Sequence, residues 1–80
     1  MSKRRSEQEI LESINPVAIF VRKKRKALGL TQEIFARRCG VGLAFLRRLE
    51  SGDENLQLSK VLQVVRYLGA ELIPNEANDA

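Results

Sequence analysis

Cysteine is a reactive nucleophile, histidine is the base that usually activates it, and both are common zinc ligands, yet this chain has one cysteine and no histidine. Cys39 cannot form a disulfide within the chain, and it lacks the base that usually activates a catalytic thiol. We expect Cys39 to be a small buried core residue, with a catalytic or redox thiol as the alternative. Phosphate-binding loops and GxGxxG motifs are also missing from the sequence. The chain is therefore predicted to be no enzyme and to bind no metal, cofactor or small-molecule ligand.

The cationic side chains are distributed unevenly along the sequence. Residues 1–30 hold eight Lys and Arg against three acids (+5), and residues 31–50 hold four against two (+2). Residues 51–80 hold two against five (−3), and the whole chain has a net charge of +4. This asymmetry predicts one face for a polyanion and a different role for the C-terminal part. A run such as residues 22–26 (RKKRK) could equally be a solvated helix face.

Residues 40–52 read GVGLAFLRRLESG, and their apolar groups raise a question about what they face. If this stretch is one helix, Leu46 and Leu49 form an ordinary apolar stripe. Three further apolar residues lie off that stripe in the first turn, where a helix in solution usually shows polar groups: Leu43, Ala44 and Phe45. The start of this helix is therefore expected to face something other than bulk water.

Capping residues and apolar periodicity predict an all-α chain of short helices. Eighty residues make one domain at most. A chain of this size buries only about 60% of the surface that it exposes when unfolded, so its core is small. The expected helices are a short one after Ser6 that ends near Ile14, then Pro16 to about Leu28, Thr31 to Cys39, Gly42 to Glu50, and Gln57 or Leu58 to Leu68. The residues expected to point inward are Val17, Phe20, Val21, Leu28, Ile34, Phe35, Cys39, Leu58, Val61, Leu62, Val65 and Leu68.

The two ends of the chain complete the expected organisation. Residues 1–14 form a basic arm and the short first helix, residues 15–69 the main domain, residues 70–74 a short strand, and residues 75–80 a disordered tail. The basic arm either enters a DNA minor groove or is solvated. No apolar run reaches the length of a membrane span and no signal-peptide pattern follows Met1, so we expect a cytoplasmic protein.

Two short helices that meet at a tight glycine turn in a basic helical chain describe a helix-turn-helix. The run LGLTQEIFARRCGVGLAFLRRLESG resembles the phage-repressor-like family, also called Cro/C1 or XRE. Thr31 and Gln32 open the first helix of the motif, Ala36 allows close helix contact, Gly40 lies in the turn, and Glu50 is near the end of the recognition helix. The resemblance covers about residues 16–69. It implies a five-helix-type, lambda-repressor-like DNA-binding domain.

The resemblance also implies which residues contact DNA. The positions that the family uses in the major groove are here Leu43, Ala44, Phe45, Arg47 and Arg48. Arginine reads guanine through two parallel hydrogen bonds, and apolar groups pack on thymine methyls. The family often has Ser, Thr or Gln where this chain has Leu43 and Phe45. The alternative for Phe45 is that it turns back into the core beside Leu49.

Other matching positions imply contacts to the DNA backbone and one structural pair. Gln32 matches a phosphate-binding position at a helix N-terminus. Further phosphate contacts are expected from Arg22, Lys24, Ser51 and Gly52. Arg25 and Glu50 match a pair that joins the first family helix to the end of the recognition helix and fixes their geometry.

The wider run, from NPVAIFVRKKRKALGLTQ to LSKVLQVVRYLGAEL, resembles HipB-type antitoxins, which bind DNA and pair with HipA-like kinase toxins. That resemblance implies a homodimer on a palindromic operator, joined through a strand formed by Ala70, Glu71, Leu72 and Ile73. A tail packed on its own domain is the alternative for this strand. The predicted function is a transcriptional repressor of a toxin-antitoxin operon that also binds a HipA-like toxin. A stand-alone phage-type repressor and a protein-binding module on the same fold are the alternatives.

Overall fold

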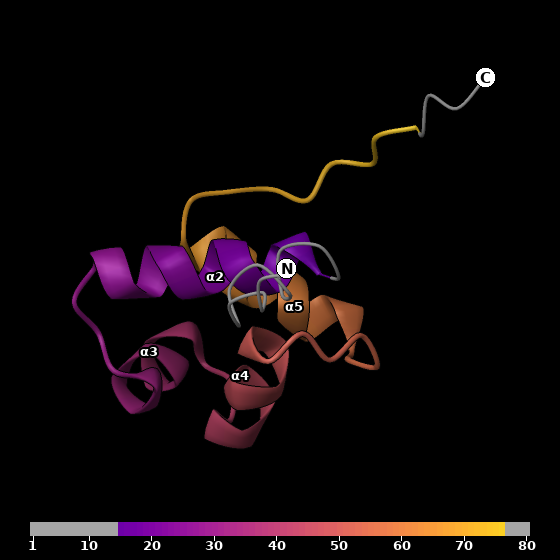
Figure 1. Cartoon of the computed structure of the whole chain (residues 1–80). Coiled ribbons are helices and arrows are strands. Elements are labelled where there is room, and N and C mark those ends of the chain that lie inside the picture. Colours follow the sequence, from indigo (N-terminus) through magenta and orange to yellow (C-terminus); the bar gives the residue numbers. More distant parts are fainter. Residues whose placement is uncertain (1–14, 77–80) are drawn as a thin grey trace, which may run out of the picture.

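The computed structural model describes residues 15–76 of the chain, and this part contains four helices and no strand. The helices are α2 (Pro16–Ala27), α3 (Gln32–Cys39), α4 (Leu43–Glu50) and α5 (Leu58–Tyr67). α4 packs against both α2 and α3, and α3 also contacts α5. In Figure 1, α2 lies across α3 and α4, and α5 lies behind α2. None of these helices is long and apolar enough to cross a membrane. The short helix expected within residues 1–14 lies outside the described residues.

The start of α2 is fixed by Asn15 and Pro16, as the sequence predicted. The side-chain oxygen of Asn15 accepts hydrogen bonds from the backbone N–H groups of Val17 (3.1 Å) and Ala18 (3.2 Å). Pro16 occupies the first helical position, where no amide hydrogen is needed. The amide of Asn15 also donates to the carbonyl of Gly52 at 3.2 Å. Asn15 therefore both caps α2 and ties it to the loop that follows α4.

The helix-turn-helix unit consists of α3, the turn at residues 40–42, and α4. Thr31 caps α3 through a hydrogen bond from the N–H of Ile34 to its hydroxyl oxygen (3.2 Å). Gly40 ends α3 with φ of 77°, a left-handed conformation that costs glycine little and other residues more. The start and the end of α3 therefore agree with those expected from Thr31 and Gly40. The amide of Gln63 in α5 donates to the carbonyls of Cys39 (2.7 Å) and Gly40 (3.2 Å), so α5 holds the turn in place.

The hydrophobic core lies between the four helices and draws on all of them. Its buried members are Val21, Phe35, Ala36, Cys39, Leu46, Leu49, Val61, Val64 and Val65. The rings of Phe35 and Tyr67 meet edge to face with their centroids 5.7 Å apart, which joins α3 to α5. For three residues the expectation that they point inward is wrong: Leu28 is 55% exposed, Ile34 38% and Leu58 62%. All three stand at the first or last turn of a helix or just beyond it, where periodicity no longer fixes which face is covered.

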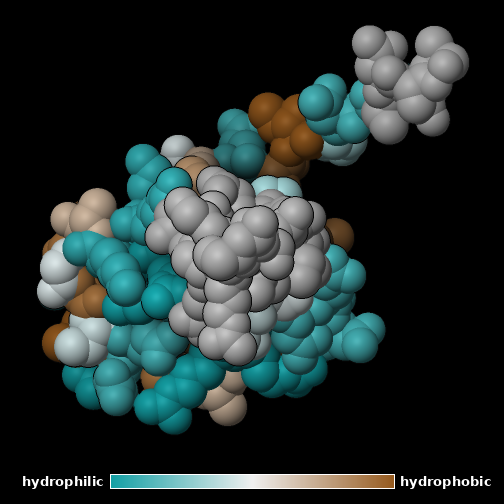
Figure 2. Space-filling view, in the orientation of Figure 1, coloured by the Kyte–Doolittle hydropathy of each residue, from teal (hydrophilic) through white to brown (hydrophobic). Residues whose placement is uncertain are grey.

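Residues 70–76 leave α5 as an extended segment without regular secondary structure (Figure 1). The strand expected at residues 70–73 is therefore not formed within this chain. The physical reason is that a strand needs a neighbouring backbone to accept and donate its hydrogen bonds, and the described part of the chain offers none beside this segment. Figure 2 shows apolar groups on the segment where it stands away from the helical body. Leu72 is 37% exposed and Ile73 74%.

Candidate nucleic-acid interface

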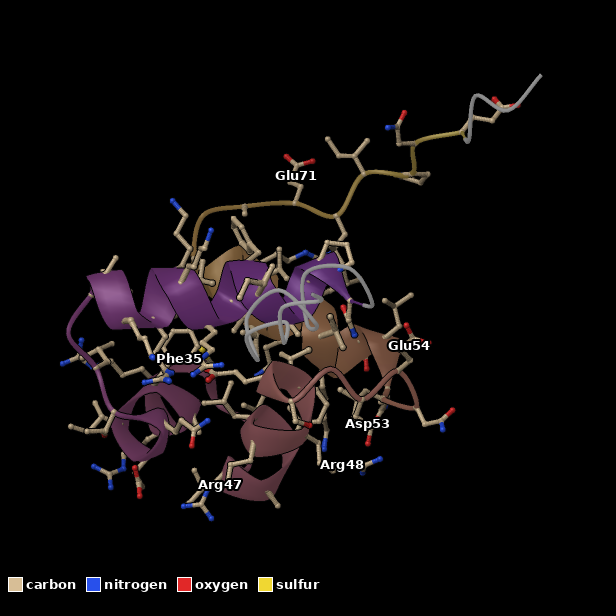
Figure 3. All side chains as sticks on the ribbon, in the orientation of Figure 1. Phe35, Arg47, Arg48, Asp53, Glu54 and Glu71 are labelled. Carbon is tan, nitrogen blue, oxygen red and sulfur yellow. The ribbon has the colours of Figure 1, made fainter. Side chains whose placement is uncertain are left out.

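The outward face of α4 is narrower than the sequence suggested. Ala44, Arg47 and Arg48 are exposed, and they follow one another around the helix on the side opposite Leu46 and Leu49. The edge of the molecule that α3 and α4 form is mostly hydrophilic (Figure 2). Figure 3 shows Arg47 and Arg48 leaving α4 in different directions. These three residues are the part of the expected base-contact set that reaches solvent freely.

Phe45 and Leu43 belong to the boundary between this face and the interior. Both are half-buried, and Phe45 packs against the hydrophobic core. Phe45 lies one helical turn before the buried Leu49, so its ring covers the same side of α4. The structure therefore places Phe45 against the core, as its alternative described, and a contact of Phe45 with DNA stays a prediction. Packing against the core accounts for Phe45, while Ala44 is exposed and Leu43 is half-buried.

Arg47 has one ionic partner within the described residues. Its Nη2 atom lies 3.6 Å from Oε2 of Glu33 on α3, and both side chains are more than half exposed. A pair this long and this well solvated holds the guanidinium weakly. Arg47 is therefore available to an incoming ligand.

Arg48 is held more firmly, by the loop that follows α4. Its Nε donates to Oδ2 of Asp53 at 2.8 Å, and its Nη2 donates to the carbonyl of Asn55 at 3.2 Å. The other carboxylate oxygen of Asp53 accepts from the backbone N–H of Asn55 at 2.8 Å. These contacts fix one end of the guanidinium, although the Arg48 side chain remains 55% exposed. Asp53 and Asn55 were not expected from the sequence to be partners of the recognition helix.

Asp53 is the acidic residue of this interface whose ionisation is shifted. The hydrogen bond from the Asn55 N–H lowers the pKa of Asp53 below its usual value of 3.8, and Arg48 lowers it further. Both effects favour the charged carboxylate. Asp53 therefore remains an anion beside Arg48 throughout the neutral range.

Beneath the surface, Arg25 and Glu50 are brought together by two hydrogen bonds. Arg25 Nε donates to Glu50 Oε2 at 2.7 Å, and Arg25 Nη2 donates to Glu50 Oε1 at 3.0 Å. Gln32 donates its side-chain amide to Glu50 Oε1 at 3.1 Å, and Arg25 Nη1 donates to the carbonyl of Leu30 at 2.7 Å. No buried side-chain nitrogen or oxygen among the described residues lacks a partner. The network links α2, the start of α3 and the end of α4.

An open hollow of about 360 Å³ lies above this network, and we refer to it as the α2–α4 groove. It is lined by Arg22, Arg25, Lys26, Gln32, Arg47, Glu50 and Ser51. The charges of Arg25 and Glu50 cancel. The groove is positively charged because of the three other cationic side chains that line it, Arg22, Lys26 and Arg47. The N-terminus of α3 also opens here, and its exposed amides favour an anion. The groove is therefore suited to a phosphate group.

The structure sorts the expected phosphate contacts into two sets. Arg22, Gln32 and Ser51 line the α2–α4 groove, although the Gln32 amide is already bonded to Glu50. Lys24 does not join them, because it lies beside Leu28 and Tyr67 on another side of α2, with its Nζ 5.8 Å from the Phe20 ring centroid. Gly52 has its carbonyl occupied by Asn15.

Besides Asn55, three residues of the site were not expected from the sequence, and two of them had a local signal. Lys26 lies four residues after Arg22, so helical spacing alone places both on one face of α2. Asp53 follows Arg48 by five residues, at the helix end where an acidic side chain can reach back. Gln63, which holds the turn at Gly40, had no signal in the sequence because its contact joins residues 23 and 24 positions apart.

Cys39 is buried, and burial raises the pKa of its thiol from 9.0 to about 11. The thiol is therefore neutral at physiological pH and behaves as a core residue. No cluster of three or more His, Cys, Asp or Glu that could hold a metal occurs in the part of the chain that the structure describes.

Comparisons with known proteins agree with this geometry. A family model described as helix-turn-helix matches residues 21–73 of this chain. An uncharacterized HTH-type transcriptional regulator of Sinorhizobium fredii, y4mF, is 41% identical over 56 residues, which cover 70% of this chain and 74% of that protein. A solved structure titled MDT Protein superposes with a TM-score of 0.62 at 18% identity, over 98% of this chain and 100% of its own, which is a likeness of fold alone. Since the matched residues include α3, the turn, α4 and every residue that lines the α2–α4 groove, the chain belongs to the helix-turn-helix family.

Proposed function

We propose that this protein is a sequence-specific DNA-binding transcriptional repressor. The observation that carries the proposal is the position of the exposed face of α4, with Arg47 and Ala44, directly beside the positively charged α2–α4 groove. Arg47 belongs to both surfaces, since it lies on the outward side of α4 and also lines the groove. A helix that presents an arginine to base edges while its neighbour holds the backbone is how helix-turn-helix domains read DNA.

In this proposal the α2–α4 groove receives one phosphate of the DNA backbone. Arg22 and Lys26 supply cations from α2, and the hydroxyl of Ser51 and the first N–H groups of α3 supply uncharged donors. Gln32 contributes through its place at the start of α3, while its side-chain amide remains bonded to Glu50. Such a contact sets the register of α4 along the major groove and carries no sequence information by itself.

Base readout is assigned to Arg47, Arg48 and Ala44. The guanidinium groups suit the O6 and N7 acceptors of guanine, and the Ala44 methyl suits the methyl group of thymine. Leu43 stays at the edge of this set because it is half-buried. The alternative of a protein-docking module loses its main support, since Phe45 packs against the core and leaves no broad apolar face at the start of α4.

We further propose that two copies bind a palindromic operator with half-sites roughly 34 Å apart. One α4 of eight residues contacts too few bases to define a site alone. Residues 70–73 are the proposed link, forming a two-stranded sheet with the same segment of a second copy. The exposed apolar surface of Ile73 supports this role, whereas the hollow that Leu72 lines with Val17 and Val65 of the same chain would favour the alternative of a tail packed on its own domain.

The narrower role, an antitoxin that regulates its own operon and binds a HipA-like kinase toxin, stays a prediction from the resemblance. A stand-alone repressor is the other possibility within the same function. Purification of the protein from its native host distinguishes them, because an antitoxin should co-purify in equal amounts with a kinase-like protein. A repressor that acts alone should co-purify with DNA only.

Selection of bound duplexes from a random-sequence DNA library tests the central proposal. We expect enrichment of a palindromic sequence, protected from cleavage in footprinting over two half-sites. The affinity should fall steeply with salt, because each neutralised phosphate releases a counterion. Recovery of no preferred sequence, together with no salt-dependent binding, would falsify the proposal.

A further inference from the structure

The two arginines of α4 are restrained to very different degrees. Among residues 15–76, Arg47 has only the 3.6 Å pair with Glu33, which is too long for a hydrogen bond. Arg48 makes two hydrogen bonds to residues 53–55, of which the one to Asp53 is charge-assisted at 2.8 Å. Figure 3 shows Arg48 and Asp53 on the same side of α4. One arginine of the proposed DNA face is therefore weakly restrained, and the other is held by hydrogen bonds.

The loop that holds Arg48 is itself well ordered by local contacts. The backbone N–H of Asp53 donates to the carbonyl of Arg48 at 3.1 Å, and the hydroxyl of Ser51 donates to the same carbonyl at 2.8 Å. Asp53 is also locked by the N–H of Asn55. The carboxylate that binds Arg48 therefore occupies a fixed position relative to the end of α4.

These bonds use only part of the guanidinium. Nε and Nη2 of Arg48 are engaged, whereas its Nη1 group makes no hydrogen bond to any of residues 15–76. The side chain is 55% exposed, so these remaining N–H groups can meet a ligand without breaking the contact to Asp53. An arginine fixed in this way loses less rotamer freedom when it binds than a free one does.

We propose that Asp53 is a specificity-determining residue that positions Arg48 for one contact to a base edge of the operator. This inference rests on the DNA-binding function proposed above. It assigns a favourable role to an acidic group on a surface that faces a polyanion. A carboxylate there otherwise repels phosphate and weakens binding to every sequence alike.

If Asp53 positions Arg48, its replacement should lower the affinity for the operator, and if Asp53 only repels phosphate, its replacement should raise that affinity. Asp53→Asn removes the charge and the charge-assisted bond, but keeps a side-chain oxygen that can accept from the Asn55 N–H. If Asp53 positions Arg48, the variant should bind the selected operator about three- to tenfold more weakly, since Arg48 regains its freedom. Binding to a random-sequence duplex should stay equal or become tighter. If Asp53 only repels DNA, the variant should bind both duplexes more tightly.

Glu54→Gln is the matched control, because Glu54 is exposed, lies one residue away and has no hydrogen bond or ion pair within the described residues. We expect this variant to bind both duplexes equally or slightly more tightly. Repeating the selection with Asp53→Asn adds a measurement that a change in loop stability alone would not alter. We expect the base preference to become weaker at one position of each half-site. Equal behaviour of the two variants on the operator would overturn the inference.

A double-mutant cycle tests whether Asp53 acts through Arg48. In an Arg48→Ala background, Asp53→Asn should cause no further loss of operator affinity. A loss that persists without Arg48 would show that Asp53 supports the loop rather than the arginine, and would overturn the inference. If the wild-type protein binds no duplex, the proposed function fails and the inference fails with it. If it binds but the cycle shows no coupling, the inference alone fails.

Discussion

Arg25 and Glu50 form a two-point ion pair inside the domain, at distances of 2.7 Å (Nε to Oε2) and 3.0 Å (Nη2 to Oε1). Arg25 is 9% exposed and Glu50 4%. The pair connects the last turn of α2 to the last turn of α4, so it helps to fix the orientation of α4 relative to α2. Buried pairs of this kind add little net stability, but the loss of one partner strands the other as an unpaired charge.

Replacement of Glu50 by Ala should therefore lower the free energy of unfolding by about 3 kcal/mol. Three donors from Arg25 and Gln32 would lose their acceptor at once. For a domain of this size, that loss lowers the melting temperature by more than about 10 °C, measured by circular dichroism. Glu54→Ala is the control, because this exposed residue should change stability by less than about 0.5 kcal/mol. Equal melting temperatures for the two variants would contradict the structural role.

Arg47→Ala should reduce the affinity for the selected operator by about 1–3 kcal/mol if Arg47 reads a base. The loss on random-sequence DNA should be much smaller. Arg66→Ala removes the same charge from α5, where Arg66 lines a different hollow with Leu62 and Ala70, and should leave the ratio of the two affinities unchanged. Equal losses on both duplexes would reduce Arg47 to a phosphate contact.

Gly40→Ala should destabilise the helix-turn-helix by about 1–2 kcal/mol. Its φ of 77° is unfavourable for alanine, and an added Cβ would lie 2.9 Å from Nε2 of Gln63. The variant must therefore displace the amide that binds the carbonyls of Cys39 and Gly40. Urea denaturation measures the change. Gly42→Ala serves as a control, since a Cβ there meets no atom within 4 Å.

Cys39 should be protected from alkylation in the folded protein. Since burial raises the pKa of its thiol from 9.0 to about 11, the thiolate fraction at neutral pH falls by about a hundredfold. The raised pKa contributes stability that is complete below pH 9.0 and is lost as the pH rises through about 11. Iodoacetamide labelling followed by mass spectrometry measures the rate with and without urea. Equal rates would show that the thiol is accessible.

Truncation after Gly69 should weaken dimerisation and lower operator affinity steeply while the helices remain intact. The segment removed contains Leu72 and Ile73, whose exposed apolar surfaces are the proposed contact with the second copy. Analytical ultracentrifugation and circular dichroism measure the two properties separately. A truncated protein that still sediments as a dimer at micromolar concentration would contradict the strand, and the interface would then have to lie elsewhere.

Local signals in the sequence determined where the helices begin and end. Asn15 with Pro16, Thr31 and Gly40 act on backbone groups only a few residues away, so their effect does not depend on the rest of the chain. The same locality made the helix-turn-helix recognisable from its spacing. The missing histidine and the single Cys39 likewise limit the chemistry available to this chain, because no fold can supply side chains that the sequence lacks.

The tertiary structure decided which side each residue faces. Phe45 turned to the core because Leu49 and the neighbouring helices cover that side of α4, whereas Leu28 and Leu58 stand where no helix covers them. Arg48 was drawn to Asp53, and Gln63 to the turn at Gly40, by contacts that depend on how helices and loops pack. Such contacts join groups that spacing along one helix cannot relate. For residues 70–73, the described part of the chain brings no second backbone alongside, so no strand forms there, and pairing with a second copy stays a prediction.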